Sequence, residues 1–234
     1  MKKKILVTGG DGRFAKVLKE KNKILDLKFL SKKELNILNE KSIEKAIKKY
    51  KPIIILHCAA LSRPMSIHDK DIKKSIDLNI IGTANITKAC EKKNIKLIYF
   101  STHYVYSGIK GNYKETDPIL PVNNYAWSKL GGEASVHLYK NSLILRLCMT
   151  EKPFIHKKAF TNVKTNFMFH EDVIPIVFKL MDRKGIINIG GKKQSIYNFA
   201  IQNNGKVKKD LAKKDQIPLN STLDLKKMKL ALKS

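Results

Sequence analysis

Tyr125 and Lys129, a tyrosine and a lysine four residues apart, are the residues of this chain best suited to proton transfer. On a helix, residues at this spacing lie on one face, so the phenol and the ammonium can point into the same space. A free phenol titrates near pH ~10 and exchanges protons poorly at neutrality. A neighbouring cation favours the phenolate and lowers the pKa of the tyrosine towards the working pH. The spacing therefore predicts acid–base catalysis, although such pairs also occur as ordinary neighbours on helix surfaces.

A glycine-rich turn near the amino terminus predicts a dinucleotide site. The apolar run Lys4–Thr8 is followed by Gly9-Gly10-Asp11-Gly12-Arg13-Phe14-Ala15 and then by a helical pattern. A strand, a glycine turn and a helix start form the context in which such a motif holds a pyrophosphate at the helix N-terminus. Gly9 allows the tight turn, Gly12 lets the backbone approach the phosphates, and Ala15 lets helix and strand pack closely. An ordinary turn between a strand and a helix is the alternative.

The sequence favours NADP as the cofactor, with NAD as the alternative. Folds selective for NAD usually carry a carboxylate at the end of the second strand, where it holds the ribose 2′-hydroxyl. Here Ser31 and Lys32 follow that strand, Glu34 comes only later, and lysine is abundant throughout the chain. A hydroxyl and an ammonium suit a 2′-phosphate, which Arg13 is expected to help bind. The predicted cofactor contacts are Gly9, Gly12, Arg13, Phe14, Ser31, Lys32, Ala59, Ala60, Tyr125 and Lys129.

Apolar runs and helical periodicity alternate along the chain, as in a parallel sheet covered by helices. Strands are predicted at Lys4–Thr8, Ile24–Leu30, Ile53–Leu56, Lys96–Phe100, Ser142–Leu147 and Gly185–Ile189. Helices are predicted at Ser42–Tyr50, Asp71–Lys93, around Tyr125, at Asp172–Met181 and once after Ser195. The apolar positions of the helix at Asp71–Lys93 include Ile72, Ile76, Ile80 and Ala84. Asn79 in the same helix is expected to be buried with hydrogen-bond partners.

Residues with small or polar side chains follow the third and fourth strands, where ligands collect in an open parallel sheet. Ala59 and Ala60 let the adenosine half of a cofactor lie close to the backbone, with close packing as the alternative. Arg63 in the next loop can meet a phosphate of the substrate or stay solvated. Thr102, after the fourth strand, is placed to face the tyrosine. His103 is a candidate substrate contact and proton-transfer group, with a hydrogen-bonded structural histidine as the alternative.

We therefore predict an α/β protein with a Rossmann-type doubly wound parallel sheet and a small carboxyl-terminal substrate lobe. A length of 234 residues suits one domain with an appended lobe. The dinucleotide-binding domain is expected at 1–149, with 168–190 completing the sheet. A reduced substrate lobe is expected at 150–167 and 191–234.

Composition narrows the class of partner. The formal charge of +27 raises the question of nucleic acid, but the lysines are spread evenly and no zinc-finger, RNP-like or Arg-rich motif is present. A positive surface also attracts dinucleotides and sugar nucleotides.

No apolar run approaches the ~20 residues of a membrane span. The three cysteines lack metal-ligand spacing and predict buried thiols in a reducing cytoplasm. The sequence leaves open whether the chain forms a homodimer.

Taken together, four motifs resemble those of the extended short-chain dehydrogenase/reductases that act on nucleotide sugars, most of all the dTDP-4-dehydrorhamnose reductases. They are Thr8–Ala15, His57-Cys58-Ala59-Ala60, Ser101-Thr102-His103-Tyr104-Val105-Tyr106 and Tyr125-x-x-x-Lys129. Further support comes from Leu30–Asn36, Asn124–Glu133 and the tail Pro218-Leu-Asn-Ser-Thr-Leu-Asp224. The resemblance covers nearly the whole chain.

The resemblance implies a reduction of a C4 ketone. Tyr125 would be the proton donor, Lys129 would hold the nicotinamide ribose and lower the tyrosine pKa, and Thr102 would hydrogen-bond the reacting oxygen. The family usually has Asp where His103 stands, and the His103-Tyr104 pair argues against the dehydration that related 4,6-dehydratases perform. The chain is also short after Met149. A nucleotide-sugar epimerase, an epimerase-reductase and a non-catalytic NADP-binding regulatory subunit therefore remain alternatives.

Overall fold

The predicted α/β architecture is confirmed by the computed structural model, which describes residues 4–213 and 216–233. Its main sheet has six strands in the order β10-β5-β4-β3-β1-β2. Their bounds are β1 Lys4–Thr8, β2 Asp26–Leu30, β3 Ile54–His57, β4 Lys96–Thr102, β5 Ser142–Leu147 and β10 Gly185–Ile189. The pairs β1–β2, β1–β3 and β3–β4 are parallel. The inner strands β1, β3, β4 and β5 are almost entirely buried, as expected for strands covered on both faces, whereas the edge strand β2 carries Asp26 and Lys28.

Helices and short strands fill the connections. The helices are α1 Arg13–Lys21, α2 Glu40–Tyr50, α3 Ile67–Lys70, α4 Ile72–Ile76, α5 Gly82–Lys92, α6 Asn124–His137, α7 His170–Leu180, α8 Ile196–Asn203 and α9 Lys226–Lys233. A π-helical turn, η1, spans Asp77–Ile81, and a 3₁₀ turn, η2, spans His103–Val105. The short strands are β6 Met149–Thr150, β7 Lys158–Phe160, β8 Lys164–Thr165, β9 Met168–Phe169, β11 Gln194–Ser195 and β12 Lys208–Asp210.

The chain divides into two compact units. The first contains the residues up to Ser101, Ser128–Ile144 and Arg183–Gly185, and the second contains Thr102–Trp127, Leu145–Asp182 and the residues from Ile186 on. Helix α6 therefore belongs to both units. The domain boundaries predicted from the sequence stay a prediction.

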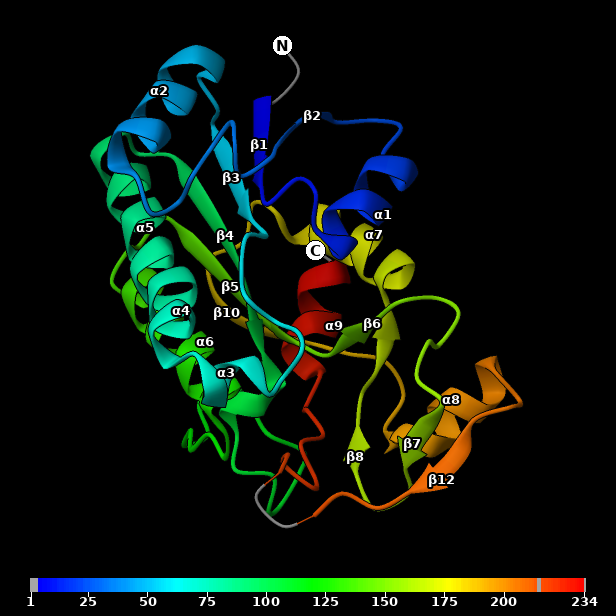
Figure 1. The fold of residues 1–234 in the computed structure, drawn as a ribbon. Coiled ribbons are helices and arrows are strands. Elements are labelled where there is room, and N and C mark those ends of the chain that lie inside the picture. The colour runs from blue at the N-terminus through cyan, green and yellow to red at the C-terminus, as the bar shows by residue number, and fades with distance from the viewer. Residues whose placement is uncertain (1–3, 214–215, 234) are drawn as a thin grey trace. The chain divides into compact units, whose positions relative to one another are not determined.

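In the first unit, parallel register brings three strand ends to the same level. Thr8 lies beside Leu30 of β2 and beside His57 of β3. Helices α2 and α5 cover one face of these strands and α1 lies on the other (Figure 1). The loops after β1, β2 and β3 therefore emerge together, as a site at the carboxyl ends of the strands requires.

The helix predicted at Asp71–Lys93 is continuous through α4, η1 and α5, but its buried face differs from the expected one. Ile72 and Ile76 are 57% and 41% exposed, whereas Asn79 is buried as predicted and Thr83 lies with it in the interior. These two polar residues face inward because Asn79 hydrogen-bonds to Leu61 in the loop after β3 and Thr83 hydrogen-bonds to His57 at the end of β3. Hydrophobic periodicity alone does not reveal such a face.

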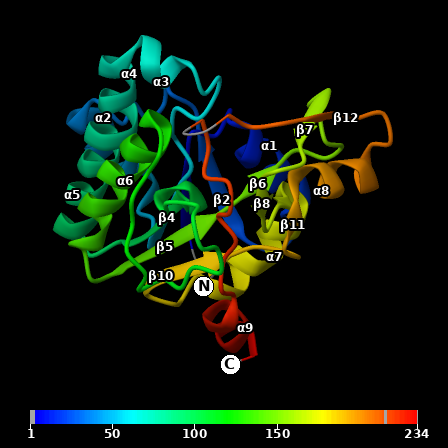
Figure 2. The same ribbon diagram turned by 90° about the horizontal axis from the view of Figure 1, so that it is seen from below.

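The second unit has its own core, which lies between short strand pairs and α8. Strands β7 and β12 are parallel neighbours and β8 pairs antiparallel with β11 (Figures 1 and 2). The buried cluster beneath them is Phe154, Ala159, Val163, Phe169, Ile196, Phe199, Ala200, Val207, Ala212 and Ile217. The described residues from Ser195 on form two helices, α8 and α9, where the sequence predicts one. Only Met228 is buried in the lysine-rich α9, so its apolar pattern is short.

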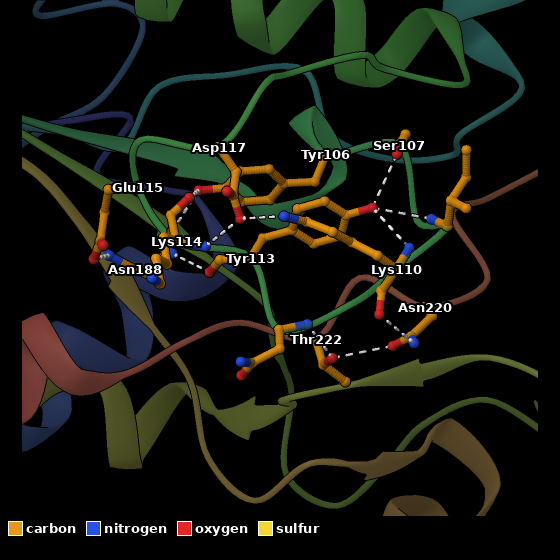
Figure 3. A network of polar contacts seen from close by, with 12 residues as sticks. Tyr106, Ser107, Lys110, Tyr113, Lys114, Glu115, Asp117, Asn188, Asn220 and Thr222 are labelled. Carbon is orange, nitrogen blue, oxygen red and sulfur yellow. Dashed lines mark hydrogen bonds and ion pairs between the residues drawn. The ribbon is translucent and has the colours of Figure 1, made fainter.

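The loop after η2 is fixed to the tail of the chain by a polar network in the second unit (Figure 3). The rings of Tyr106 and Tyr113 stack with centroids 4.6 Å apart. The Tyr113 hydroxyl accepts the N–H groups of Ile109 and Lys110, and the Thr222 hydroxyl accepts the N–H of Asn112. The family-like tail Pro218–Asp224 thus has a structural role, because it holds this loop in place.

Candidate active site

The glycine turn has the tight geometry that the motif predicts. Gly9 has φ +65°, and a Cβ atom added to it would lie 2.7 Å from the Cα atom of Ala59. The N–H of Gly12 donates to the Gly9 carbonyl at 2.9 Å, and the N–H of Gly10 donates to Leu30 at 2.8 Å. Gly12 then stands immediately before α1. A side chain at Gly9 would both clash and strain the backbone, so this position needs glycine.

A hollow of about 480 Å³ lies beside this turn in the first unit. Ser31 and Lys32, both predicted from the sequence, line it together with Asp11, Lys33 and Asn36. The last three were not predicted, although each is close in sequence to a residue that was. Lysine side chains around a hollow at the end of the second strand suit a phosphate attached to the adenosine ribose.

Glu34 binds to its own loop. Its Oε2 atom accepts both the N–H and the hydroxyl of Ser31, each at 2.9 Å. The backbone hydrogen bond from Ser31, followed by the hydroxyl bond, lowers the pKa of this exposed carboxyl. The Ser31 hydroxyl therefore already donates its proton to Glu34, which leaves the lysines as the principal groups for an added phosphate.

The other predicted cofactor and substrate residues of the first unit lie around the same loops. The Arg13 guanidinium donates to the Ser62 hydroxyl at 3.1 Å, in the loop that also contains the half-buried Arg63. The Phe14 ring is 7% exposed and packs on Phe100, with centroids 5.0 Å apart. Packing is thus the observed role of the Phe14 ring.

A buried histidine, missed from the sequence, ties the strand ends together. His57 bonds through Nδ1 to the Thr8 hydroxyl at 2.8 Å and through Nε2 to the Thr83 hydroxyl at 3.1 Å. The Thr8 hydroxyl also accepts the N–H of Ala59. Burial, assisted by the charge of Lys129, lowers the pKa of His57 to about 3. The imidazole is therefore neutral at pH 7 and positions the alanine loop.

Asn79 has the partners that its predicted burial requires. Its side chain accepts the N–H of Leu61 at 2.7 Å and donates to the Leu61 carbonyl at 2.9 Å. It also donates to the Ser128 hydroxyl at 2.8 Å. Asn79 lies in the π turn η1, a feature that often marks functional sites. This amide therefore holds the loop after β3 and the first-unit part of α6 in a fixed relation.

Lys129 is a buried lysine with a strongly perturbed titration. It is 4% exposed, its Nζ atom lies 4.2 Å from the centroid of the Tyr99 ring, and its carbonyl accepts the Tyr99 hydroxyl. Burial lowers the pKa of Lys129 to about 7, while the carboxyl of Glu133 and the thiol of Cys58 act in the opposite direction. A lysine in this environment responds to any anion placed beside it.

Two predicted residues of the second unit, Thr102 and His103, are the last residue of β4 and the first of η2. Thr102 is 4% exposed, and its hydroxyl accepts the N–H of Tyr104 at 3.2 Å, which leaves the O–H proton able to donate. His103 Nδ1 lies 3.1 Å from the Leu147 carbonyl, so Nδ1 carries the proton. Burial lowers the pKa of His103 to about 4. The observed geometry is that of a hydrogen-bonded structural histidine, with a neutral Nε2 that has no partner among the described residues.

Tyr125 is half-buried in the first turn of α6. Its ring meets Tyr104 edge-on, with centroids 6.3 Å apart and an interplanar angle of 84°. Asn123 supports this turn, since its side-chain oxygen accepts the N–H of Ala126. Helix α6 runs unbroken to His137, so Tyr125 and Lys129 are on one helix at the predicted spacing.

The described part of the chain also bears on metal binding, membrane spanning and thiol chemistry. Residues 4–213 and 216–233 contain no group of three or more His, Cys, Asp or Glu side chains arranged to hold a metal ion. The helices in these ranges are all too short or too polar to span a membrane. Cys58, Cys90 and Cys148 are free thiols. Burial raises the pKa of Cys58 to about 12, which makes it a poor nucleophile.

Comparison with known proteins gives relatives of two kinds. The beta subunit of methionine adenosyltransferase 2 from Xenopus laevis is 35% identical over 102 residues, which are 44% of this chain and 30% of that protein. The dTDP-4-dehydrorhamnose reductase of Aggregatibacter actinomycetemcomitans is 32% identical over 155 residues, 63% of this chain and 51% of the enzyme. The matches thus span between about a third and a half of these relatives.

A solved structure has the same fold over almost its whole length. The dTDP-4-dehydrorhamnose reductase of Bacillus anthracis, in complex with NADP, superposes with a TM-score of 0.86 at 22% identity, covering 98% of this chain and 93% of the other. The family described as the RmlD substrate binding domain matches residues 2–166. This match takes in well over half of the sequence, and the chain therefore belongs to the RmlD substrate-binding domain family.

Proposed function

We propose that this protein reduces the C4 ketone of a 4-keto-6-deoxy nucleotide sugar with NADPH, and that Tyr125 donates the proton. The observation that carries the proposal is the buried, low-pKa Lys129 one helical turn after Tyr125, in a member of this family. Support also comes from the reductases among the relatives, one of which was solved with NADP.

The residues of the glycine turn fit a dinucleotide. Gly9 has no room for a side chain and Gly12 precedes α1, so the backbone alone faces a pyrophosphate at the helix start. Lys32 and Lys33 line the neighbouring hollow, where an adenosine phosphate would be held. When bound, the nicotinamide supplies the hydride that adds to the ketone carbon.

The protein's own part in the reaction is proton transfer and charge stabilisation. Negative charge develops on the ketone oxygen as its carbon is reduced, and the O–H groups of Tyr125 and Thr102 donate to that oxygen. Tyr125 gives up its proton and becomes a phenolate, which the ammonium of Lys129 stabilises. Return of a proton from solvent to the phenolate completes the cycle. With a pKa of about 7, Lys129 is only partly protonated at neutral pH in the absence of ligand. Bound anions would raise this pKa, so that the side chain becomes the ammonium that stabilises the phenolate.

Turnover tests the function directly. With a dTDP-linked 4-keto-6-deoxyhexose, the protein is expected to oxidise NADPH in equal moles to the 4-hydroxy product, measured by absorbance and by chromatography of the sugar. An epimerase would interconvert sugars without net oxidation of NADPH. Absence of both reactions, with the dTDP- and UDP-linked sugars alike, would contradict an enzymatic function.

A regulatory subunit is the second candidate, because the beta subunits of methionine adenosyltransferase 2 match this chain at up to 36% identity. The same preparation should then bind a methionine adenosyltransferase catalytic subunit and change its rate. That result without any sugar reduction would favour the regulatory function. The presence of Thr102, Tyr125 and Lys129 favours catalysis.

Cofactor preference gives a prediction about Lys32. We expect NADPH to bind more tightly than NADH, because Lys32 lines the hollow and its positive charge would attract the 2′-phosphate. Lys32→Ala should weaken NADPH binding about tenfold, or ~1.4 kcal/mol, and leave NADH unchanged. Fluorescence titration measures both. Lys28→Ala, at an exposed lysine on β2 outside the hollow, is the matched control. Equal affinities for both cofactors in the unmodified protein would reject the preference.

We also propose that the protein forms a homodimer and is located in the cytoplasm. The exposed isoleucines Ile72, Ile76 and Ile81 on α4 and η1 support a homodimer, and light scattering at the assay concentration would distinguish it from a monomer. The three free cysteines support the predicted cytoplasmic location, which cell fractionation would test.

A further inference from the structure

The second unit carries a hollow that contains none of the residues proposed for catalysis or cofactor binding. Its volume is about 660 Å³, a size usual for sites that bind small molecules (~300–1,000 Å³). The lining comes from β8, β11 and the turn before it, α8 and β12, with Thr161 and Thr222 in addition. These strands and α8 are neighbours in Figures 1 and 2. The site is therefore built within one unit from segments far apart in the sequence.

Four lysines from three of these segments line the hollow. Lys164 lies on β8, Lys192 and Lys193 precede β11, and Lys209 lies on β12. Strand pairing places Lys164 opposite Ser195, at the start of α8. The lysines are thus gathered by the fold, because nothing in the local sequence connects positions 164, 192 and 209.

Carboxylates are kept away from these lysines. None of the described residues that line the hollow is acidic. The nearest carboxyl along β12 is Asp210, whose Oδ2 atom lies 3.8 Å from Nζ of Lys158, outside the hollow. Successive side chains of a strand point to opposite faces, so Asp210 and Lys209 are separated in this way. Within residues 4–213 and 216–233, the ion pairs include none of the four lysines.

The remaining lining supplies neutral polar groups and one aromatic ring. Gln194, Asn198 and Gln202 bring amide groups that donate and accept hydrogen bonds. Nζ of Lys209 lies 5.6 Å from the centroid of the Tyr197 ring. A ligand with a charged part and an uncharged polar part would find complementary groups here.

We propose that this hollow binds a small molecule that carries two or more phosphate groups. Four ammonium groups without a counter-charge repel one another, and a polyanion placed among them replaces that repulsion with attraction. Lysine is a compact point charge that binds phosphate without a fixed fork geometry. Several phosphates are needed to meet lysines that come from β8, β12 and the turn between β10 and β11. A volume of about 660 Å³ suits a small molecule, whereas a nucleic-acid strand needs a groove that continues along the surface.

The experiment is calorimetric titration of the full chain with inorganic pyrophosphate at low salt. Excess NADPH is present so that the glycine turn does not take up the probe. The double variant Lys164→Gln/Lys209→Gln should lose at least tenfold in affinity for pyrophosphate. The matched control Lys206→Gln/Lys208→Gln, which removes two exposed lysines next to Lys209 that do not line the hollow, should change it less than twofold.

Equal affinities in the two double variants would overturn the proposal, as would the absence of binding to the unmodified protein. Thermal unfolding by circular dichroism confirms that both variants are folded. A single-stranded RNA 12-mer serves as the second probe. Binding of this RNA at lower concentration than pyrophosphate, with the same loss in Lys164→Gln/Lys209→Gln, would overturn the small-molecule ligand in favour of nucleic acid.

Discussion

Tyr125→Phe should reduce kcat/KM for the 4-keto sugar nucleotide by about a thousandfold, in the middle of the ~10²–10⁴ range of general acid catalysis. The substitution removes one oxygen and keeps the ring, so the edge-on contact with Tyr104 can persist. Loss of the proton donor leaves the developing oxyanion with Thr102 alone. The measurement is the initial rate of NADPH oxidation, with the affinity for NADPH determined separately by fluorescence and expected to stay within a few-fold.

A matched control removes a phenolic hydroxyl elsewhere. Tyr50→Phe, at the end of α2, should retain the rate of the unmodified protein. The pH profile gives a second test, because kcat/KM should fall as the essential acid loses its proton and this descending limb should vanish in Tyr125→Phe. If Tyr125→Phe turns over sugar at the unmodified rate, Tyr125 is not the proton donor.

The sheet was predictable because its strands are buried runs of apolar, β-forming residues. The bounds predicted for Ser142–Leu147 and Gly185–Ile189 are those observed. The glycine turn was equally predictable, since Gly9 needs a positive φ and a close approach that only glycine allows. Local sequence suffices where local geometry sets the residue type.

The support around the site was harder to predict because it is polar and non-local. His57 bridges Thr8 and Thr83, and the three are separated by 49 and 26 positions. Asn79 was expected to be buried, but its partner Ser128 lies 49 positions away. Hydrogen bonds of this kind leave no periodic signal in the sequence, and the inward face of α4–α5 therefore carried fewer isoleucines than the pattern suggested.

The two hollows also differ in how far their lining residues could be predicted from the sequence. Ser31 and Lys32 were predicted because a known fold places a cofactor at the end of the second strand. The lysines of the second-unit hollow were read from sequence as part of a general excess of positive charge. Only the pairing of β8 with β11 and of β7 with β12 brings those segments close to one another.

Lys129→Met should change stability and activity in opposite directions. The pKa of Lys129 is about 7 in the folded protein, against about 10.5 for an unperturbed lysine. Between these values the unfolded chain binds a proton that the folded protein does not, so the free energy of unfolding rises with pH from about 7 to about 10.5. Below pH 7 the full cost of burying the ammonium is present. Methionine has a similar unbranched shape and no charge, so Lys129→Met should stabilise the cofactor-free protein by on the order of a few kcal/mol at pH 6.

The gain should shrink as the pH rises from about 7 towards 10.5, because the folded protein then holds a neutral lysine and no longer bears the cost of a buried ammonium. Urea unfolding at a series of pH values measures it, and Lys140→Met, at an exposed lysine, is the control without a pH-dependent effect. Reductase activity should fall by ~10²–10⁴-fold, since the Tyr125 phenolate loses its stabilising cation. Parallel stability curves for the unmodified protein and Lys129→Met from pH 6 to pH 10 would show that Lys129 is not held as a buried, easily neutralised amine. The cation needed for proton transfer would then have to be sought elsewhere.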